Sequence, residues 1–402
     1  MREVVFVDFA RTAFANRGGA LRSFAASELA AECIKGLLNR SGILEKGGQH
    51  VIDSVFAGSA QRDKLAVAPV RYSLLAAGLP EETVGHQVEM QCGSAITSIN
   101  HAAFQIALGY ADVVIAGGME SLSTCPVYMS TTTEPYKGQA PGWLSIHLSP
   151  FPEHDINMLK VSDGMAKKWG ISREACDEFA LRSQSRLDAG YKTGLIGPEI
   201  VPVTIPATRK MPEIIVDKDE YPKPQSTREG LAKLKPINED GVTTAGNASG
   251  LNDGAAFVLM MTAEKAKELG YIPYARWVTG ADIGVEPRYM GIGPAFSNLK
   301  AMKFAGLDIK DVDVWDCNEA FAAQNLSVIK EMESLTGTTI DQNKWNPLGG
   351  AIAIGHPNGA SGARIAMFTM KQLEKTGGRY GVFSACCGGG HGTTTIIENL
   401  RR

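Results

Sequence analysis

Residues 87–118, QVEMQCGSAITSINHAAFQIALGYADVVIAGG, hold a strand pattern, a turn of small residues, a helical run and a second strand pattern in close succession. Residues 87–90 predict the first strand, and the apolar run 95–108 predicts a helix that Gly109 ends. Residues 112–116 predict a buried strand that closes on two glycines. Strands and helices that alternate in this way are typical of an α/β fold with a mostly parallel sheet.

The same order of elements returns near the C-terminus. Residues 359–390, GASGARIAMFTMKQLEKTGGRYGVFSACCGGG, begin with small residues, continue as a helix to about Glu374, and then form a strand that runs into glycines. This repetition indicates a diverged internal duplication. We therefore expect an N-terminal half made of residues 1–120 and 250–274, and a C-terminal half made of residues 275–402.

Residues 121–249, between the two halves, differ in character because prolines interrupt the pattern repeatedly. Inside this region residues 163–187 predict one charged helix. A connection of this length without structure is uncommon in a compact protein, so we expect an inserted subdomain. An insertion over the face of an α/β core often covers a ligand site.

The composition narrows the range of functions. The chain has 402 residues, with 40 Lys and Arg against 43 Asp and Glu, and a net charge of −3. Proteins that bind nucleic acid usually carry a basic excess, so we expect no nucleic-acid partner. With 44% apolar and 21% charged residues, the chain is typical of a globular protein.

The cysteines and the apolar runs indicate the compartment. The seven cysteines are an odd number with irregular spacing, which favours free thiols in a reducing compartment over a disulfide framework. Their spacing also predicts no metal site. No run reaches the ~18 apolar residues of a membrane span, and the N-terminus is unlike a signal peptide. We expect a cytoplasmic protein.

Cys92 is a candidate nucleophile because it directly precedes a predicted helix. The positive end of the helix dipole favours a thiolate, so we expect the pKa of this thiol to be lowered. The small residues Gly93 and Ser94 leave room for a bulky acyl group. The alternative for a cysteine in such a turn is a buried structural thiol.

His356 lies in the glycine-rich bend GHPNGASG, residues 355–362, before the second helix. Proline after the histidine restricts the backbone, and glycines permit unusual φ values that aim the imidazole inward. A histidine near a cysteine nucleophile is the expected base for its proton. The alternative is a solvated or structural histidine.

Cys386 and Cys387 end the second predicted strand and are followed by three glycines. Successive backbone N–H groups in such a bend form a nest that accepts developing negative charge. A disulfide between these neighbours is a redox alternative, which the strain of its ring disfavours.

Asn318 and Glu319 follow a predicted strand over residues 312–315. The asparagine either caps the next helix or holds a water beside the end of the strand. The glutamate is either a catalytic carboxylate or a support for the loop. The glycine-rich segments lack the spacing of a phosphate-binding loop, and residues 291–293 lack the third glycine of a dinucleotide fingerprint.

Taken together in their order along the chain, these motifs resemble the thiolase family from Arg11 to the C-terminus. The matching stretches are residues 92–94, 117–121, 245–256, 318–321, 355–362 and 386–392. The resemblance implies a duplicated five-layered α-β-α-β-α core with an inserted loop subdomain. It also implies an acyltransferase that cleaves 3-ketoacyl-CoA with coenzyme A, or runs the reverse condensation, as in fatty acid degradation by β-oxidation.

The resemblance assigns roles to individual residues. Cys92 matches the nucleophile that carries the acyl group, and His356 the base that takes its proton. Cys386 matches a second acid/base for the acetyl-CoA enolate. Asn318 matches the residue that holds an oxyanion-site water beside His356. The N–H groups of Cys92 and Gly388 match a second oxyanion site.

The resemblance also implies the ligands and partners. Ser249 matches a position that contacts the pantetheine arm of CoA, and Ala248 and Lys223 are candidate CoA contacts beside it. Coenzyme A is then a substrate, with no permanently bound cofactor and no metal. A homodimer or a tetramer of dimers is implied, with or without an accessory subunit.

Some positions depart from the family pattern and bear on the acyl group. These are His391, residues 157–160, residues 95–97 and Lys223. They leave a linear, branched, aromatic or carboxylated acyl group open, and His391 is a candidate to face it. The alternatives to a thiolase are a condensing ketoacyl synthase of the same fold and an inactive scaffold protein. Cys386 argues against the synthase, and the complete set of Cys92, His356 and Cys386 argues against the scaffold.

Overall fold

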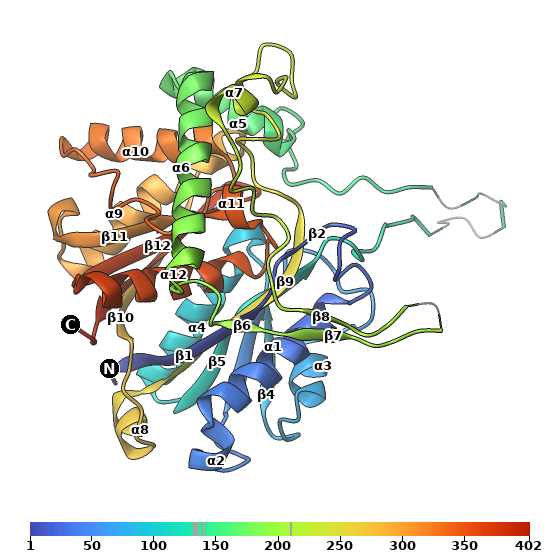
Figure 1. Ribbon diagram of the computed structural model, residues 1–402, viewed down its shortest axis with the longest axis vertical. Coiled ribbons are helices and arrows are strands. Elements are labelled where there is room, and N and C mark those ends of the chain that lie inside the picture. The colour runs from blue at the N-terminus through green and yellow to red at the C-terminus, as the bar shows by residue number, and fades with distance from the viewer. Residues whose placement is uncertain (132–135, 138–139, 141, 210) are drawn as a thin grey trace.

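The computed structural model describes residues 1–131, 136–137, 140, 142–209 and 211–402. Figure 1 shows the N-terminal half in blue and cyan, apart from its last strand, β9, in yellow, and most of the C-terminal half in orange and red. The principal elements of the first half are β1 (Val4–Thr12), α1 (Ala26–Ser41), β3 (Ser54–Gly58), α3 (Pro69–Ala76), β4 (Val84–Val88), α4 (Ser94–Leu108), β5 (Val113–Ser121) and β9 (Asn252–Thr262). Those of the second half are β10 (Ala275–Gly284), α9 (Gly293–Ala305), β11 (Val312–Cys317), α10 (Ala322–Thr336), α12 (Ser361–Thr376), β12 (Tyr380–Cys387) and β13 (His391–Asn399).

The strand order confirms the predicted duplication. The first half has the order β1-β9-β5-β3-β4 and the second half the order β10-β13-β12-β11, and the pairing of β1 with β10 joins them into one sheet. In each half the first two pairings are antiparallel and the third is parallel. The expectation of a mostly parallel sheet was therefore wrong, because β9 and β13 each run antiparallel to both of their neighbours. Trp345 forms a parallel bridge with Trp315 of β11, where the first half has β4.

Alternating side chains along the strands produce the layers. In β1, Val4 and Phe6 pack into a central core with α4 and α12, whereas Val5 and Val7 face a second core with α1. The outer face of the second half packs on α9 and α10 in a third core. Both faces of each half of this sheet are therefore covered, which is why the strands are apolar on both sides. The two halves of the sheet form two layers between three layers of helices, which confirms the expected five-layered architecture.

Two predicted boundaries were wrong. The strand expected at residues 87–90 is β4, which ends at Val88, because the Glu89 carboxylate accepts hydrogen bonds from the backbone and side chain of Gln91 and turns the chain. The single helix expected at residues 163–187 is two helices, α5 (Met158–Trp169) and α6 (Arg173–Lys192). Gly170, with φ of 61°, ends the first of them in the left-handed conformation that glycine adopts readily.

The two halves meet where their glycine-rich turns approach each other. A Cβ atom on Gly118, at the end region of β5, would lie 1.9 Å from the carbonyl oxygen of Gly359. A Cβ on Gly362, in the first turn of α12, would lie 2.7 Å from the backbone nitrogen of Ile96 in α4. Only glycine permits such contact, so these positions set the distance between the halves.

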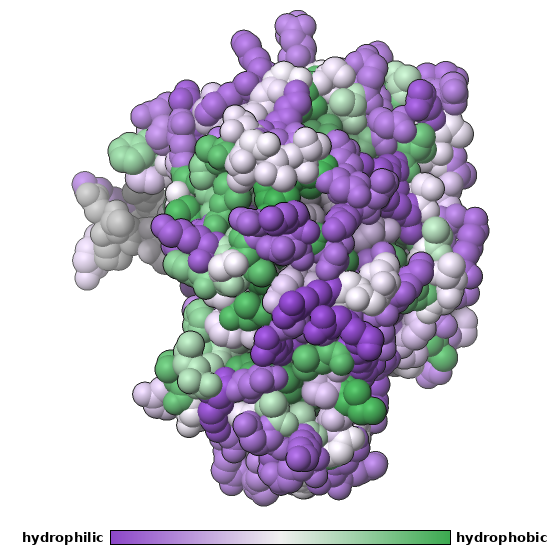
Figure 2. All heavy atoms as spheres, turned by 90° about the vertical axis from the view of Figure 1, so that its left-hand side faces the viewer, coloured by the Kyte–Doolittle hydropathy of each residue, from purple (hydrophilic) through white to green (hydrophobic). Residues whose placement is uncertain are grey.

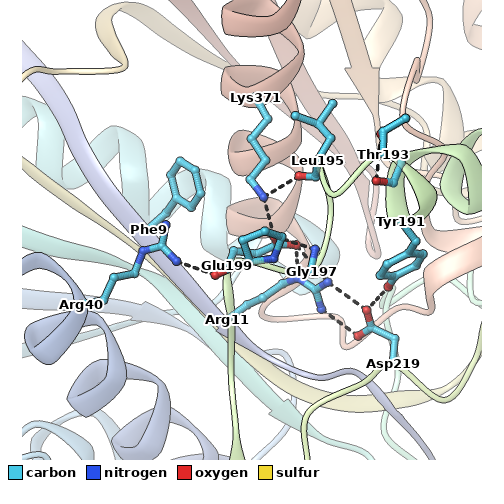
Figure 3. Close-up of polar contacts among 12 residues, drawn as sticks. Phe9, Arg11, Arg40, Tyr191, Thr193, Leu195, Gly197, Glu199, Asp219 and Lys371 are labelled. Atoms are coloured by element: carbon cyan, nitrogen blue, oxygen red, sulfur yellow. Dashed lines mark hydrogen bonds and ion pairs between the residues drawn. The ribbon is translucent and has the colours of Figure 1, made fainter.

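The segment between β5 and β9 also contains β6 (Ile200–Val201), β7 (Val203–Ile205), β8 (Ile214–Val216) and α7 (Arg228–Ala232). A buried ion network ties it to the core (Figure 3). Arg11 of β1 makes an ion pair with Glu199 at 3.0 Å and a bidentate pair with Asp219 at 2.7 and 2.8 Å. Lys371 of α12 pairs with Glu199, and the Tyr191 hydroxyl donates to Asp219. Charges this deeply buried require such partners, so the network fixes the segment in place.

The outer surface is of mixed polarity. On the face shown in Figure 2, hydrophobic side chains occur in small groups that hydrophilic side chains separate. In the described part of the chain, every helix is too short or too polar to cross a membrane.

We predict that Gly118→Ala destabilises the fold by about 2–3 kcal/mol, because the new methyl group has no space against two backbone oxygens. The measurement is the free energy of unfolding from urea denaturation. Gly164→Ala is the matched control, since a Cβ there meets its nearest atom at 3.9 Å in the middle of α5. That variant should be more stable than the parent by about 0.5–1 kcal/mol. Equal stability of the two variants would contradict the tight contact at Gly118.

Candidate active site

Cys92 lies in a short 3-10 turn, Gln91–Gly93, directly before α4. Gln91 has a φ of 47°, a conformation that costs a non-glycine residue about 1–2 kcal/mol. A Cβ on Gly93 would lie 2.4 Å from the Sγ of Cys387, so glycine is required where this turn meets the end of β12. The turn before the first-half helix therefore rests on the second half of the molecule.

Cys92 and His356 line the same cavity, which has a volume of about 420 Å³. Ala248 and Ser249, two of the predicted CoA contacts, line it as well. The other lining residues are Met158, Leu159, Tyr221, Ile237, Ala245, Gly250, Leu251, Met290, Ala320, Phe321 and Asn358. Residues from both halves and from the inserted segment thus enclose one largely apolar space.

His356 is buried, and its hydrogen bonds define which ring nitrogen carries the proton. Nδ1 lies 2.6 Å from the Ser361 hydroxyl, which donates to the carbonyl oxygen of Pro357 at 3.0 Å. Because the hydroxyl proton is used in that bond, the hydroxyl accepts from Nδ1–H. Nε2 is then free of a proton, and the Asn318 Nδ2, 3.3 Å away, donates to it. Such a nitrogen is able to accept a proton from a neighbouring thiol.

Burial controls the charge of both reactive groups. Desolvation, with a smaller effect of Arg364, lowers the pKa of His356 to about 3. Desolvation, with the nearby carboxylates of Glu120 and Glu89, raises the pKa of Cys92 to about 12. The expectation that the helix end lowers the pKa of Cys92 was therefore wrong, because loss of water outweighs the partial charge of the helix. At neutral pH the cavity holds a neutral thiol and a neutral imidazole.

Cys386 is fully buried near the end of β12. Burial raises the pKa of its thiol well above the usual value, and the charge of Cys92 raises it further. The two sulfur atoms are therefore close enough to influence each other, although they come from opposite halves of the chain. Cys386 and Cys387 are both free thiols, so the disulfide alternative is not the state of this structure.

The two residues after β11 have different surroundings. Asn318 does not cap α10, whose N-cap is Phe321, and its buried Oδ1 has no hydrogen-bond partner among the described residues. That oxygen is placed to accept from a water. The carboxylate of Glu319 accepts hydrogen bonds from Ser183, Asn346 and Ile352. Glu319 therefore supports the loop and joins it to α6, which settles the question left open by the sequence.

The remaining predicted residues lie around this cavity in different ways. Gly388 faces Gln91, since a Cβ on it would lie 3.1 Å from the Gln91 Cγ. Lys223 does not line the cavity, but its Nζ lies 4.8 Å from the ring centre of Tyr221, which does. His391 is exposed at the start of β13, where it pairs with Cys387, and it does not line the cavity.

Two residues of the site were missed by sequence reasoning. Ser361 holds the imidazole through its hydrogen bond with Nδ1. It lies five residues after His356, in the motif of residues 355–362, but no role was predicted for it. Glu120 is buried, and its carboxylate accepts from the backbone N–H groups of Ala60, Gln61 and Gly359. Burial raises the pKa of Glu120 to about 7. A lone carboxylate at the end of an apolar strand was the available signal for it.

Known proteins resemble this chain over its whole length. The family models for the thiolase N-terminal domain and the thiolase C-terminal domain match residues 4–264 and 271–399. A β-ketoadipyl-CoA thiolase of Pseudomonas putida is 40% identical over 100% of both chains. An acetyl-CoA acetyltransferase of Allochromatium vinosum is 38% identical over 99% of both.

Solved structures agree with these relatives. The Bacillus anthracis acetyl-CoA acetyltransferase superposes with a TM-score of 0.90 at 37% identity, and human mitochondrial 3-ketoacyl-CoA thiolase with 0.89 at 36%. Each covers 99% of both chains. The fold is that of an acyltransferase with a duplicated α/β body. Both family models match, and the chain belongs to the thiolase family.

We predict that Ser361→Ala lowers kcat about tenfold and leaves KM unchanged, because the imidazole loses the acceptor that fixes its tautomer. Steady-state kinetics of acyl transfer is the measurement. The matched control is Ser98→Ala in α4, whose buried hydroxyl likewise bonds the carbonyl four residues earlier but does not contact a histidine. Equal losses in the two variants would refute a specific role of Ser361.

We also predict that alkylation of Cys92 by iodoacetamide accelerates about tenfold per pH unit from about pH 7 to about pH 10, since only the thiolate reacts. A thiol whose pKa is raised to about 12 remains protonated throughout this range. Mass spectrometry of the peptide that contains Cys92 gives the rate, and Cys92→Ser identifies the peptide. A plateau below pH 8 would show a thiolate and contradict the effect of burial.

Proposed function

We propose that this chain catalyses thiolytic cleavage of a 3-ketoacyl-CoA by coenzyme A, or the reverse Claisen condensation. The products are acetyl-CoA, or another short acyl-CoA, and a shortened acyl-CoA. The observation that carries the proposal is the cavity that Cys92 and His356 share. The buried thiol of Cys386 is near enough for a charge on Cys92 to affect its pKa. Membership of the thiolase family supports the same chemistry.

In the first half-reaction, the Cys92 sulfur attacks the 3-keto carbon while its proton passes to the Nε2 of His356. The bond between carbons 2 and 3 then breaks, and its electron pair forms the enolate of acetyl-CoA. Cys386 donates its proton to carbon 2, so acetyl-CoA leaves and an acyl-thioester remains on Cys92. A raised pKa is suitable for Cys386, because this thiol must hold its proton until the enolate appears.

In the second half-reaction, the Cys386 thiolate takes the thiol proton of an incoming CoA, and the CoA sulfur attacks the acyl-thioester. Cys92 leaves as a thiolate and recovers its proton from His356. The sequence is ping-pong, because acetyl-CoA departs before CoA reacts. Both protons return to their starting sites, so the enzyme is regenerated.

Two oxyanion sites are part of the proposal. A water held by the Oδ1 of Asn318, together with His356, stabilises the enolate oxygen, and the unpartnered state of that Oδ1 supports this assignment. The backbone N–H groups of Cys92 and Gly388 stabilise the oxygen of the tetrahedral intermediate, since Gly388 lies beside the turn that holds Cys92. A ketoacyl synthase mechanism is disfavoured by the thiol at position 386.

Coenzyme A acts as a substrate in this proposal. Its apolar pantetheine arm matches the cavity wall, where Ala248 and Ser249 lie. Lys223, which packs on the ring of Tyr221 beside the cavity, supplies a positive charge for the phosphates of CoA. We further propose a homodimer or a tetramer of dimers. Strand β4 supports it, because in the described part of the chain β4 is the edge strand of the first half and Val84 is 50% exposed.

The thiolysis of acetoacetyl-CoA, followed by the absorbance of its magnesium enolate, tests the roles of the two cysteines. Cys92→Ser should lower kcat/KM by about 1000-fold or more. Cys386→Ala should lose about 100-fold or more in thiolysis, yet Cys92 should still become acylated when the variant is given acetyl-CoA. Cys33→Ala, a change of a fully buried cysteine in α1, is the control and should retain activity.

Two outcomes would overturn these assignments. Parent-like turnover by Cys92→Ser would remove the nucleophile from the proposal. Condensation that survives in Cys386→Ala would place the second acid/base at another residue.

A further inference from the structure

Asn346 lies beside the end of β11, the strand that leads to Asn318. Its neighbour Trp345 forms the parallel bridge with Trp315, and the N–H of Asn346 donates to the carbonyl oxygen of Trp315 at 2.7 Å. Asn346 is buried, and its φ of 48° is in the left-handed region, which asparagine enters more readily than most residues. The turn directs its carboxamide back toward the strand, where it meets Cys317.

The carboxamide of Asn346 binds the residues on both sides of Asn318. Its Oδ1 accepts from the N–H of Cys317 at 2.7 Å, and its Nδ2 donates to the carbonyl oxygen of Cys317 at 2.9 Å. Nδ2 also donates to the Oε1 of Glu319 at 2.9 Å. Because the N–H of Cys317 only donates and its carbonyl oxygen only accepts, a single orientation of the amide satisfies all three contacts.

The main chain of Asn318 is fixed more firmly than its side chain. The N–H of Asn318 donates to the carbonyl oxygen of Ser384 in β12 at 2.8 Å, and its carbonyl oxygen accepts from the Nδ2 of Asn325 at 3.0 Å. Among the described residues, the side chain of Asn318 bonds to the Nε2 of His356 at 3.3 Å, and its Oδ1 has no partner. The direction of this side chain therefore depends on the main chain around it.

We infer that Asn346 is a positioning residue for the oxyanion site at Asn318. By fixing the residues on both sides of Asn318, it directs the Nδ2 of Asn318 toward His356 and the Oδ1 toward the proposed water. Asn346 does not line the cavity, so it acts on the reaction through Asn318. The inference rests on the function proposed above and extends it to a residue outside the cavity.

The surroundings of Asn346 hold its segment in place without its side chain. Arg186 of α6 donates to the carbonyl oxygens of Gln342, Trp345 and Asn346. The main-chain bond from Asn346 to Trp315 is also independent of the side chain. Glycine adopts a φ of 48° without strain. We therefore expect Asn346→Gly to fold and to lose only the three side-chain hydrogen bonds.

Thiolysis of acetoacetyl-CoA by Asn346→Gly is the first test. We expect kcat to fall by at least about tenfold, because a displaced oxyanion group stabilises the transition state less. KM should change by less than about twofold, because the cavity wall is unaltered. Asn346→Asp keeps the shape and the acceptor but loses a donor, so its kcat should fall as well. Parent-like kcat in either variant overturns the inference.

A double variant distinguishes positioning from a merely structural role. Asn318→Ala alone should lower kcat by about 100-fold or more. If Asn346 acts through Asn318, the variant that combines Asn318→Ala with Asn346→Gly should have the kcat of Asn318→Ala within about threefold. Losses that multiply in the double variant overturn the inference.

Asn399 provides the matched control, because its buried carboxamide also bonds three main-chain groups. Its Nδ2 donates to the carbonyl oxygens of Leu373 and Gly378, and its Oδ1 accepts from the N–H of Arg401. These contacts lie at the C-terminal end of α12, whereas the site lies at its N-terminal end. Asn399→Gly should lower the free energy of unfolding in urea as Asn346→Gly does, yet retain the parent kcat. Equal losses of kcat in the two variants would show a general effect of stability and overturn the inference.

Crystal structures of the parent and of Asn346→Gly separate this inference from the proposed function. They show, without turnover, whether the Nδ2 of Asn318 keeps its hydrogen bond to His356. We expect this bond in the parent and its loss in the variant, and an unmoved Asn318 overturns the inference. If the parent does not cleave acetoacetyl-CoA, the proposed function fails, while the two crystal structures still decide whether Asn346 positions Asn318.

Discussion

The close packing of α4 against α12 is the constraint on which the rest of the site depends. Each helix begins directly after a turn, and these turns carry Cys92 and His356. Glycines at 118 and 362 let the two halves approach until little space remains between their backbones. The reactive groups are therefore withdrawn from water, and both are neutral at rest. In the proposed reaction, proton transfer between them then accompanies bond formation with the substrate and does not precede it.

Much of the fold was predictable because its signals are local. Residues 87–118 and 359–390 each carry their own strand, turn and helix pattern, and the five-layered duplication follows from repeating it. Cys92 and His356 were predictable as partners for the same reason. The sign of the pKa shift of Cys92 was not, since desolvation depends on side chains distant in sequence. For the same reason, the sequence did not predict the hydrogen bond that Ser183 donates to Glu319, because the two residues are 136 positions apart.

The carboxylate of Glu120 has both a structural and an electrostatic effect. The carboxylate of Glu120 holds the backbone of Gly359 and Ala60 at the junction of the halves, and it also acts on the Cys92 sulfur. A structural hydrogen-bond acceptor thus also raises the pKa of the proposed nucleophile. The apolar wall formed by Met158, Leu159 and their neighbours removes water, which strengthens this effect.

The buried ion network of Arg11 limits how the inserted segment can be exchanged between related enzymes. Its carboxylates, Glu199 and Asp219, belong to the insert, whereas Arg11 and Lys371 belong to the two halves of the core. In a chimera with an insert from another enzyme, Arg11 and Lys371 would be buried without a carboxylate partner. The exception is a donor that has acidic residues at the positions of Glu199 and Asp219. This segment can therefore be exchanged only with that of related enzymes that carry the same two carboxylates, whatever ligand their loops bind.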